Sequence, residues 1–336
     1  MSRPTTIKGE VVKAYLTEFP KTANLTLARK IKKETGLLFD DVEQARTMIR
    51  NYVGSNGKAH RENIADKRFL RNKTVDSGEN PYDLPDSDAK EYYPFVLPKV
   101  NNRIIIMGDI HSPYHDNKAI TATIDWAKEK DINTVILNGD TTDCHHLSTF
   151  VTDPRKRHFV EEREITWRLL DKIQNALPNV TFFLKAGNHE DRFERYLMVK
   201  APEIFSTEEF RYDIIMRLGE RGIIYIGDKL IIKAGDLSIV HGHELRGGSR
   251  VVNTARWLFN KAKEDSVTNH FHDVSEHSEP TLSGKLIITW AVGCLCNLHP
   301  EYDPNARWSQ GFARILVEPN NSYKVFNARI IEGKVQ

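Results

Sequence analysis

Several short apolar segments after residue 100 end on residues that are costly to bury. The first is IIIM at 104–107, which is followed directly by GDIH. Five such fragments carry Asp109 and His111; Asp140 and Asp143; Asn188, His189 and Glu190; His241 and His243; and His270 and His272, although only Val267 precedes the last pair. In α/β folds, binding sites form in the loops at the carboxyl ends of strands. We therefore expect the five fragments to converge in one cleft.

The residue types in these fragments predict a metal centre. Carboxylate oxygens, imidazole nitrogens and one amide oxygen suit Mn²⁺, Fe or Zn²⁺, and no thiolate is needed. The spacing of Asp109 and His111 would return both side chains to one side of an extended backbone, and His270 and His272 have the same spacing. A glycine before each of the first two aspartates would allow a tight turn. Each fragment alone is a weak signal, and the combination is a strong one.

The segments between these fragments predict an α/β domain. Short apolar, β-branched runs indicate strands at 103–107, 134–138, 181–186, 237–242, 285–293 and 312–318. Helical patterns separate most of them, at 117–130, 160–177 and 249–264. This alternation predicts one or two sheets covered by helices.

The front of the chain differs from the rest in charge. Residues 1–73 contain 16 Lys+Arg and 8 Asp+Glu, which leaves 32 Lys+Arg and 38 Asp+Glu for the remainder, and His60 is the only histidine before residue 100. This asymmetry predicts two units with different roles. Residues 74–99, rich in Pro, Asp and Ser, are expected to form a linker.

Residues 1–73 show three amphipathic helical patterns. The third is expected to start at Asp40 or Asp41, with Glu43 placed for a capping box with Asp40. Three short helices with a basic face resemble a helix-turn-helix or winged-helix fold, in which four polar residues would face a DNA groove: Arg46, Thr47, Arg50 and Asn51. A basic helical bundle used for protein contacts or oligomerisation is the alternative.

The sequence also indicates the cellular compartment of the protein. The N-terminal sequence lacks the apolar segment of a secretory signal, and no stretch is long enough to cross a bilayer. Three cysteines, Cys144, Cys294 and Cys296, suit a reducing compartment. We expect the cytoplasm, or the host cytoplasm for a viral gene.

The order DxH, GDxxD, GNHE, H-G and HxH resembles the calcineurin-like metallophosphoesterase superfamily over roughly residues 100–336. The resemblance implies a four-layer α/β/β/α sandwich with two divalent ions, of which Mn²⁺ is favoured over Fe, Zn²⁺ or Ni²⁺. It implies these ligands: Asp109, His111 and His272 for one ion, Asn188, His241 and His270 for the other, and Asp140 between them. His189 would contact the substrate, and Asp143 would orient the His189 imidazole. A hydroxide bridging the ions would then attack phosphorus.

Two departures from the family pattern bear on the substrate. Asn269 replaces the glycine of the usual GHxH, so the local turn should differ. Cys144 and Ala186 stand where protein phosphatases of the family carry phosphate-binding arginines. This favours a phosphodiester over a doubly charged monoester, unless one of three other cations compensates: Lys185, Arg192 or Arg246.

The leading hypothesis is a phosphodiesterase or nuclease that residues 1–73 bring to nucleic acid. A phosphomonoesterase acting on a nucleotide or phosphoprotein is the second. A DNA-binding regulator with an inert phosphoesterase body is the third. Cys294 and Cys296 are expected to serve packing.

Overall fold

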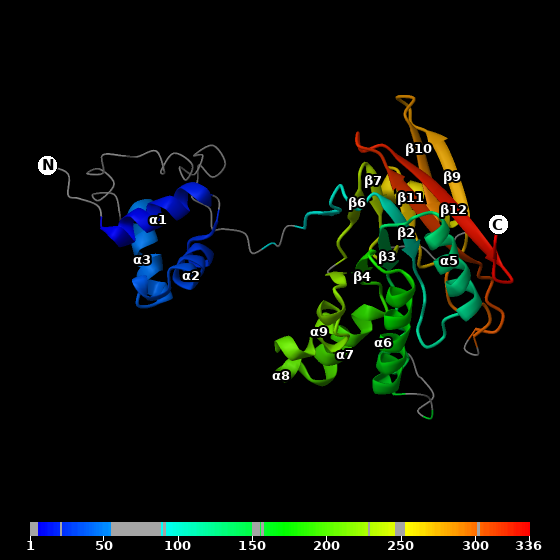
Figure 1. Cartoon of the computed structure of the whole chain (residues 1–336), viewed down its shortest axis with the longest axis horizontal. Coiled ribbons are helices and arrows are strands. Elements are labelled where there is room, and N and C mark those ends of the chain that lie inside the picture. The colour runs from blue at the N-terminus through cyan, green and yellow to red at the C-terminus, as the bar shows by residue number, and fades with distance from the viewer. Residues whose placement is uncertain are drawn as a thin grey trace. The chain divides into compact units, whose positions relative to one another are not determined.

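Figure 1 shows a computed structural model of the whole chain, which describes residues 6–20, 22–54, 89, 92–149, 155, 158–227, 229–245, 253–300 and 303–336. The chain divides into two compact units, Met1–Lys90 and Glu91–Gln336, called here the N-terminal and C-terminal units. The predicted linker lies largely outside the described residues. Phe95 and Val96, within its predicted range, instead form a strand of the C-terminal unit, because they pair with Ile232 and Lys233.

The described part of the N-terminal unit contains the three predicted helices, α1 (Ile7–Glu18), α2 (Asn24–Thr35) and α3 (Val42–Val53), and a 3₁₀ turn at Gly36–Leu38. Their apolar faces meet in one core that includes Leu16, Leu27, Ile31 and Ile49, all fully buried. Burial of these faces holds the short helices together, since isolated helices of this length are marginal in water.

The start of α3 agrees with one of the two predicted caps, whereas the predicted capping box is not formed. Asp41 is the capping residue, and its side chain accepts a 2.7 Å hydrogen bond from the Gln44 backbone N–H. The Gln44 amide oxygen in turn accepts from the backbone N–H of Asp40. The expected capping box of Asp40 with Glu43 is therefore wrong; Glu43 forms ion pairs with Arg46 and Arg50.

Two sheets form the centre of the C-terminal unit (Figure 1). The first has the order β13 (Lys334–Val335), β12 (Tyr323–Ile331), β11 (Gln310–Val317), β2 (Arg103–Met107), β3 (Thr134–Asn138), β4 (Thr181–Lys185) and β5 (Ile224–Ile226). The second has the order β1 (Phe95–Val96), β6 (Ile232–Ala234), β7 (Leu237–Ile239), β8 (Ser266–Thr268), β10 (Leu286–Ala291) and β9 (Ser275–Pro280). Strands β2 to β5 run parallel, as do β7, β8 and β10.

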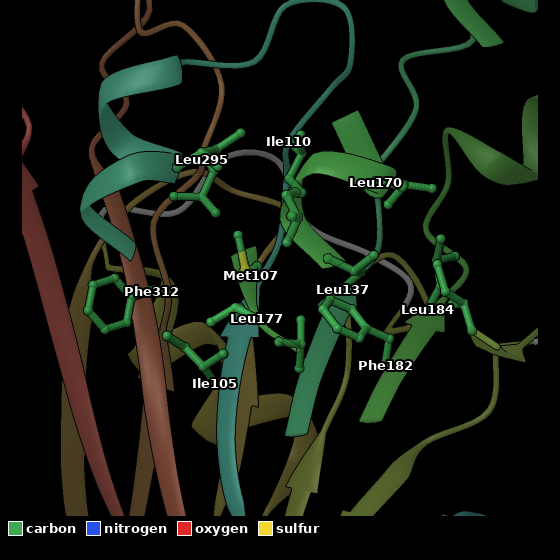
Figure 2. Close-up of a cluster of buried hydrophobic side chains, with 14 of the residues drawn as sticks. Ile105, Met107, Ile110, Leu137, Leu170, Leu177, Phe182, Leu184, Leu295 and Phe312 are labelled. Atoms are coloured by element: carbon green, nitrogen blue, oxygen red, sulfur yellow. The ribbon is translucent and has the colours of Figure 1, made fainter. Parts of the chain in front are cut away.

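Alternate side chains of β2 show how the layers are built. Ile105 and Met107 join the core between the first sheet and helices α5 (Asn117–Glu129) and α6 (Phe159–Ala176), part of which Figure 2 shows. Ile104 and Ile106 point to the other face, into a core shared with the second sheet. Both faces of the strand are buried, which explains its continuous apolar run.

The outer face of the second sheet is covered by α10 (Thr254–Ala262), whose Trp257 and Leu258 pack with Val240. The predicted four-layer α/β/β/α sandwich is confirmed.

Helices α7 (Glu190–Lys200), α8 (Pro202–Phe205) and α9 (Tyr212–Ile215) follow β4. Short 3₁₀ turns lie at His145–Leu147, Glu208–Phe210 and Gly219–Arg221. No helix in the described ranges combines the length and apolar character that crossing a bilayer requires.

Candidate metal centre

The five predicted fragments follow β2, β3, β4, β7 and β8, and the structure brings them to one place. Backbone pairing continues beyond the strands, since Asp109 N–H donates to Gly139 C=O (3.1 Å) and His111 N–H donates to Asp140 C=O (2.8 Å). The loops after β2 and β3 therefore lie against each other. This pairing places Asp109 and Asp140, each of which follows a glycine, side by side.

The backbone at the candidate ligands is not extended. The φ angle is +50° at Asp109, +47° at His111, +51° at Asp140, +68° at His270 and +57° at His272. The expectation that alternation along an extended chain aligns each pair was wrong: left-handed turns aim the side chains instead. Non-glycine residues in this region cost about 1 kcal/mol each, and such strain gathers at functional sites.

Asp109, His111 and His272 form the first candidate group, and all three side chains are buried. His272 Nε2 lies 3.2 Å from His111 Nε2 and 3.6 Å from Asp109 Oδ1. His111 Nε2 is also 3.8 Å from Asp140 Oδ2. Four potential donor atoms therefore face one point from three different loops.

The second candidate group lies on the other side of Asp140. His241 Nε2 is 3.2 Å from Asp140 Oδ2 and 3.3 Å from the amide oxygen of Asn188. His270 has a ring nitrogen within 4.8 Å of donor atoms of both Asp140 and His241. Asp140 Oδ2 thus lies between the two groups, in the place that the resemblance implies for a bridging ligand.

Protonated histidines partly compensate the negative charge of the buried carboxylates. Burial works against the charge of Asp140, yet His189 and His241 hold its pKa well below the usual range. Burial likewise opposes charge on His241 and His272, but the neighbouring aspartates raise their pKa values to about 10 and about 9. Divalent cations would replace those protons as the counter-charge.

The residues present fit divalent cations. Asp109 Oδ1 is fully buried and has no hydrogen-bond partner among the described residues. Such an atom costs about 1–3 kcal/mol when nothing satisfies it. The donor set of carboxylate, imidazole and amide groups is one that Mn²⁺, Fe and Zn²⁺ accept.

His189 and Asp143 occupy the edge of this centre. His189 Nδ1 lies 2.7 Å from the Asp143 backbone oxygen and 3.2 Å from its carboxylate, while His189 Nε2 lies 3.7 Å from Asp140 Oδ2. The Asp143 carboxylate is closer to His111, at 2.9 Å from Nδ1. The same carboxylate is therefore placed to orient two histidines, of which sequence reasoning had assigned it only His189.

Arg192 is the cation closest to His189 in this arrangement. It lies on α7, donates to the Asp143 backbone oxygen (3.0 Å) and has Nη2 2.8 Å from His189 Nε2. Of the other cations considered, Lys185 is fully buried and pairs with Glu244, while Arg246 lies outside the described residues. The positions at Cys144 and Ala186, both buried, offer no positive charge.

Two glycines near the centre, Gly139 and Gly108, lie so close to neighbouring side chains that a Cβ atom would not fit. Gly139 has φ +82°, and a Cβ there would lie 2.3 Å from His241 Nδ1. A Cβ on Gly108 would lie 2.5 Å from the Asn269 side chain. Asn269 is buried and joins Asn138 (2.8 Å) to the Gly293 backbone oxygen (3.3 Å). The Asn that departs from the family pattern therefore occupies the space that Gly108 leaves.

Two buried glutamates that sequence reasoning gave no role hold the loop after β3. Glu190 accepts hydrogen bonds from the backbone N–H groups of Asp140, Thr141, Thr142 and Gly187. Glu162, on α6, accepts from those of Cys144 and His145. Burial is the main cause that raises the pKa of Glu190 to about 7 and that of Glu162 to about 8. Glu162 lies within a helical pattern that carries no sequence mark of such burial, whereas Glu190 belongs to the GNHE fragment, for which sequence reasoning named no hydrogen-bond partner.

A cleft of about 500 Å³ adjoins the centre at Asn188. Its lining also includes Tyr92, Arg195, Lys229 and His243. The walls combine an aromatic ring, two cations and a candidate metal ligand with the carboxylates of Asp191 and Glu194. The cleft therefore has room for substrate groups beyond the reacting phosphate, but its lining is not predominantly positive.

The family assignment follows from comparison with known sequences. The profile of the calcineurin-like phosphoesterases matches residues 102–306, more than half of the chain. The chain belongs to the calcineurin-like phosphoesterase family. Membership makes the protein a hydrolase of phosphate esters, and the family implies divalent metal ions.

Individual relatives are distant. The gene 54 proteins of Mycobacterium phages D29 and L5 are 23% and 24% identical over 239 and 236 residues, which cover 66% and 65% of this chain and 91% and 90% of the relatives. Vps29 from Cryptosporidium parvum matches with a TM-score of 0.39 and 15% identity, over 70% of this chain and 94% of its own. The nuclease MPE of Pseudomonas putida matches with a TM-score of 0.29 and 11% identity, over 68% and 87%.

Proposed function

We propose that the protein hydrolyses phosphodiester bonds in nucleic acid, using two divalent cations, with Mn²⁺ favoured. The observation that carries this proposal is the arrangement of six potential ligands around a seventh, Asp140: Asp109, His111 and His272 lie on one side, and Asn188, His241 and His270 on the other. Bound there, the ions would supply Lewis acidity for a phosphate oxygen and for water.

The protein's own groups would act on the leaving oxygen. His189 has its Nδ1 turned to the Asp143 backbone oxygen, and its Nε2 accepts a hydrogen bond from Arg192. Nε2 would become available to carry a proton for the leaving oxygen once Arg192 turns to a bound phosphate. Arg192 reaches the same nitrogen and would contact a phosphate oxygen placed there. We assign His189 and Arg192 to the substrate, and Asp143 to the orientation of His189 and His111.

The charge around the site favours a diester. Cys144 and Ala186 provide no cations, and Lys185 is paired with Glu244, which leaves Arg192 as the guanidinium at His189. A phosphomonoester carries about one more negative charge than a diester at neutral pH and needs more positive charge to bind. The cleft at Asn188 supports the same choice, because a diester has a second substituent to accommodate.

We further propose that the N-terminal unit, predicted as residues 1–73, contacts the nucleic acid. Thr47, Arg50 and Asn51 are exposed on α3, while Arg46 is half-buried. Both arginines pair with Glu43, at 3.3 and 3.2 Å, so binding of phosphate has to compete with that carboxylate. Contacts with another protein are the alternative role.

The phage relatives support a location in the cytoplasm of an infected cell.

The test uses the full chain with Mn²⁺ on bis-p-nitrophenyl phosphate, p-nitrophenyl phosphate and labelled DNA. We expect cleavage of the diester and DNA, and loss of both in Asp140→Asn. Arg192→Ala should lower activity on the diester, whereas Arg211→Ala, an exposed arginine paired with Asp213, should not. Cleavage of the monoester alone would reject the diesterase, and Asp140→Asn with full activity would reject the metal centre.

A further inference from the structure

Two cysteines lie beside the first candidate metal group. Both sulfur atoms of Cys294 and Cys296 and one ring nitrogen of His272 lie within 4.8 Å of one another. Both thiols are free and buried, with exposed fractions of 0% and 1%. Sequence reasoning had assigned the two cysteines to packing, which does not account for the neighbouring imidazole.

Backbone pairing fixes the positions of all three residues. Cys294 N–H donates to the Ser309 backbone oxygen (3.0 Å), and Ser309 N–H donates to the His272 backbone oxygen (2.8 Å). The Gln310 side-chain amide donates to the Cys296 backbone oxygen (3.0 Å). One short segment at the start of β11 thus holds the two thiols and the histidine together, so the three donors are in place before any ion binds.

His272 also has a nitrogen that no group of the described residues satisfies. Its Nδ1 is buried and has no hydrogen-bond partner within the described ranges, while Nε2 faces Asp109 and His111. The residue as a whole is 7% exposed. A buried ring nitrogen without a partner is costly in a purely structural role.

We propose that His272, Cys294 and Cys296 form a binding site for a thiophilic divalent cation, of the Zn²⁺ or Cd²⁺ class, which shares His272 with the candidate metal centre. Two thiolates and one imidazole are typical ligands for such ions and leave a fourth position open. Binding converts both thiols to thiolates, requires His272 as the neutral imidazole, and releases all the displaced protons to solvent, with no change of oxidation state. Mn²⁺ prefers oxygen ligands and gains little from the sulfurs.

Sharing of His272 has a consequence for catalysis. A thiophilic ion held by the cysteines takes one ligand from the group of Asp109, His111 and His272. The Mn²⁺-loaded protein should therefore lose activity when Zn²⁺ or Cd²⁺ is added. This consequence rests on the proposed function, whereas the binding site itself does not.

The test titrates Cd²⁺ into the reduced, chelator-treated full chain and follows the ultraviolet sulfur-to-cadmium charge-transfer absorption. We expect the band to saturate at one equivalent, to vanish in Cys294→Ser/Cys296→Ser and to persist in Cys144→Ser. The double variant should also bind Cd²⁺ at least about tenfold more weakly. No band in the wild type, or a band that survives in the double variant, overturns the proposal.

A second measurement needs no variant and covers the case in which the double variant does not fold. The cadmium-113 resonance of the wild-type protein should fall in the low-field region typical of two thiolate ligands. A resonance typical of oxygen and nitrogen ligands alone overturns the proposal. Absence of phosphodiester hydrolysis in all samples would count against the proposed function and would leave both cadmium readouts unaffected.

Discussion

Replacement of Glu244 by glutamine should destabilise the C-terminal unit by about 3 kcal/mol at neutral pH. Glu244 forms an ion pair with Lys185, whose side chain is fully buried at the end of β4. It also accepts hydrogen bonds from the backbone N–H groups of His241 (3.1 Å) and Gly242 (2.6 Å). The substitution removes the negative charge and leaves the Lys185 ammonium group buried without a counter-ion.

The magnitude follows from the pKa of Glu244. Burial opposes its ionisation, but attraction to Lys185 and the nearby histidines lowers the pKa from 4.5 to about 2. That difference corresponds to about 3 kcal/mol in favour of the charged form, which agrees with the 3–5 kcal/mol typical of breaking a buried pair. Because the pKa is lower in the folded state, this stability is complete above pH 4.5 and is lost as the pH falls towards about 2.

Urea unfolding followed by tryptophan fluorescence measures the effect. All five tryptophans lie after residue 100, so the signal reports on the C-terminal unit alone. The matched control is Glu264→Gln, which breaks the partly exposed pair with Lys233 (3.0 Å) and should cost less than about 1 kcal/mol.

Two outcomes would refute the reasoning. A Glu244→Gln protein within about 0.5 kcal/mol of the wild type would show that Lys185 does not depend on this carboxylate. Equal losses in Glu244→Gln and Glu264→Gln would show that burial of the pair does not decide its strength. The double variant Lys185→Met/Glu244→Gln should be more stable than Glu244→Gln, since it removes the uncompensated charge.

Three further substitutions test the site. Gly139→Ala places a methyl group against His241 and should lower the metal-dependent hydrolysis of bis-p-nitrophenyl phosphate about a hundredfold; unchanged activity would contradict the close approach. Asp143→Asn removes the carboxylate from His111 and His189 and should lower kcat about tenfold or more, so a loss confined to KM would argue against an orienting role. Burial and the nearby Asp143 raise the pKa of Glu162 from 4.5 to about 8, so the folded state keeps a proton that the unfolded chain loses between these values, and stability falls as pH rises through this window. Glu162→Gln should flatten that dependence in urea midpoints measured across the window, and an unchanged slope would exclude Glu162 as its source.

Prediction from sequence succeeded where a local pattern is sufficient. Strands β2, β3 and β4 are continuous apolar runs because both faces are buried, and their ends match the predicted bounds within one residue. Strand β9 could not be predicted from its sequence, SEHSEP, because it is a polar edge strand that depends on pairing with β10. Strands β5, β6 and β8 have three residues each, too few to show a period.

The same limit applies to the site. The identity of the candidate ligands could be predicted because glycine, aspartate and histidine at strand ends form a recognisable order. The roles of Glu162 and Glu190 could not, since their burial depends on packing of α6 and α7 against the loop after β3. The backbone at Asp109 and His111 was misjudged because a two-residue spacing is compatible with more than one conformation.

The sequence by itself determined an α/β domain with covering helices, the chemical types of the candidate ligands and their order along the chain, while the four layers were implied by the family resemblance. These depend on hydrophobic periodicity and on short motifs, both of which are local. Only the tertiary structure decided that Asp143 serves two histidines, that Arg192 stands beside His189 and that two thiols lie against His272. His272 and Asp109 are separated by more than 160 positions, and their contact exists because strand register and left-handed turns bring distant loops to one point.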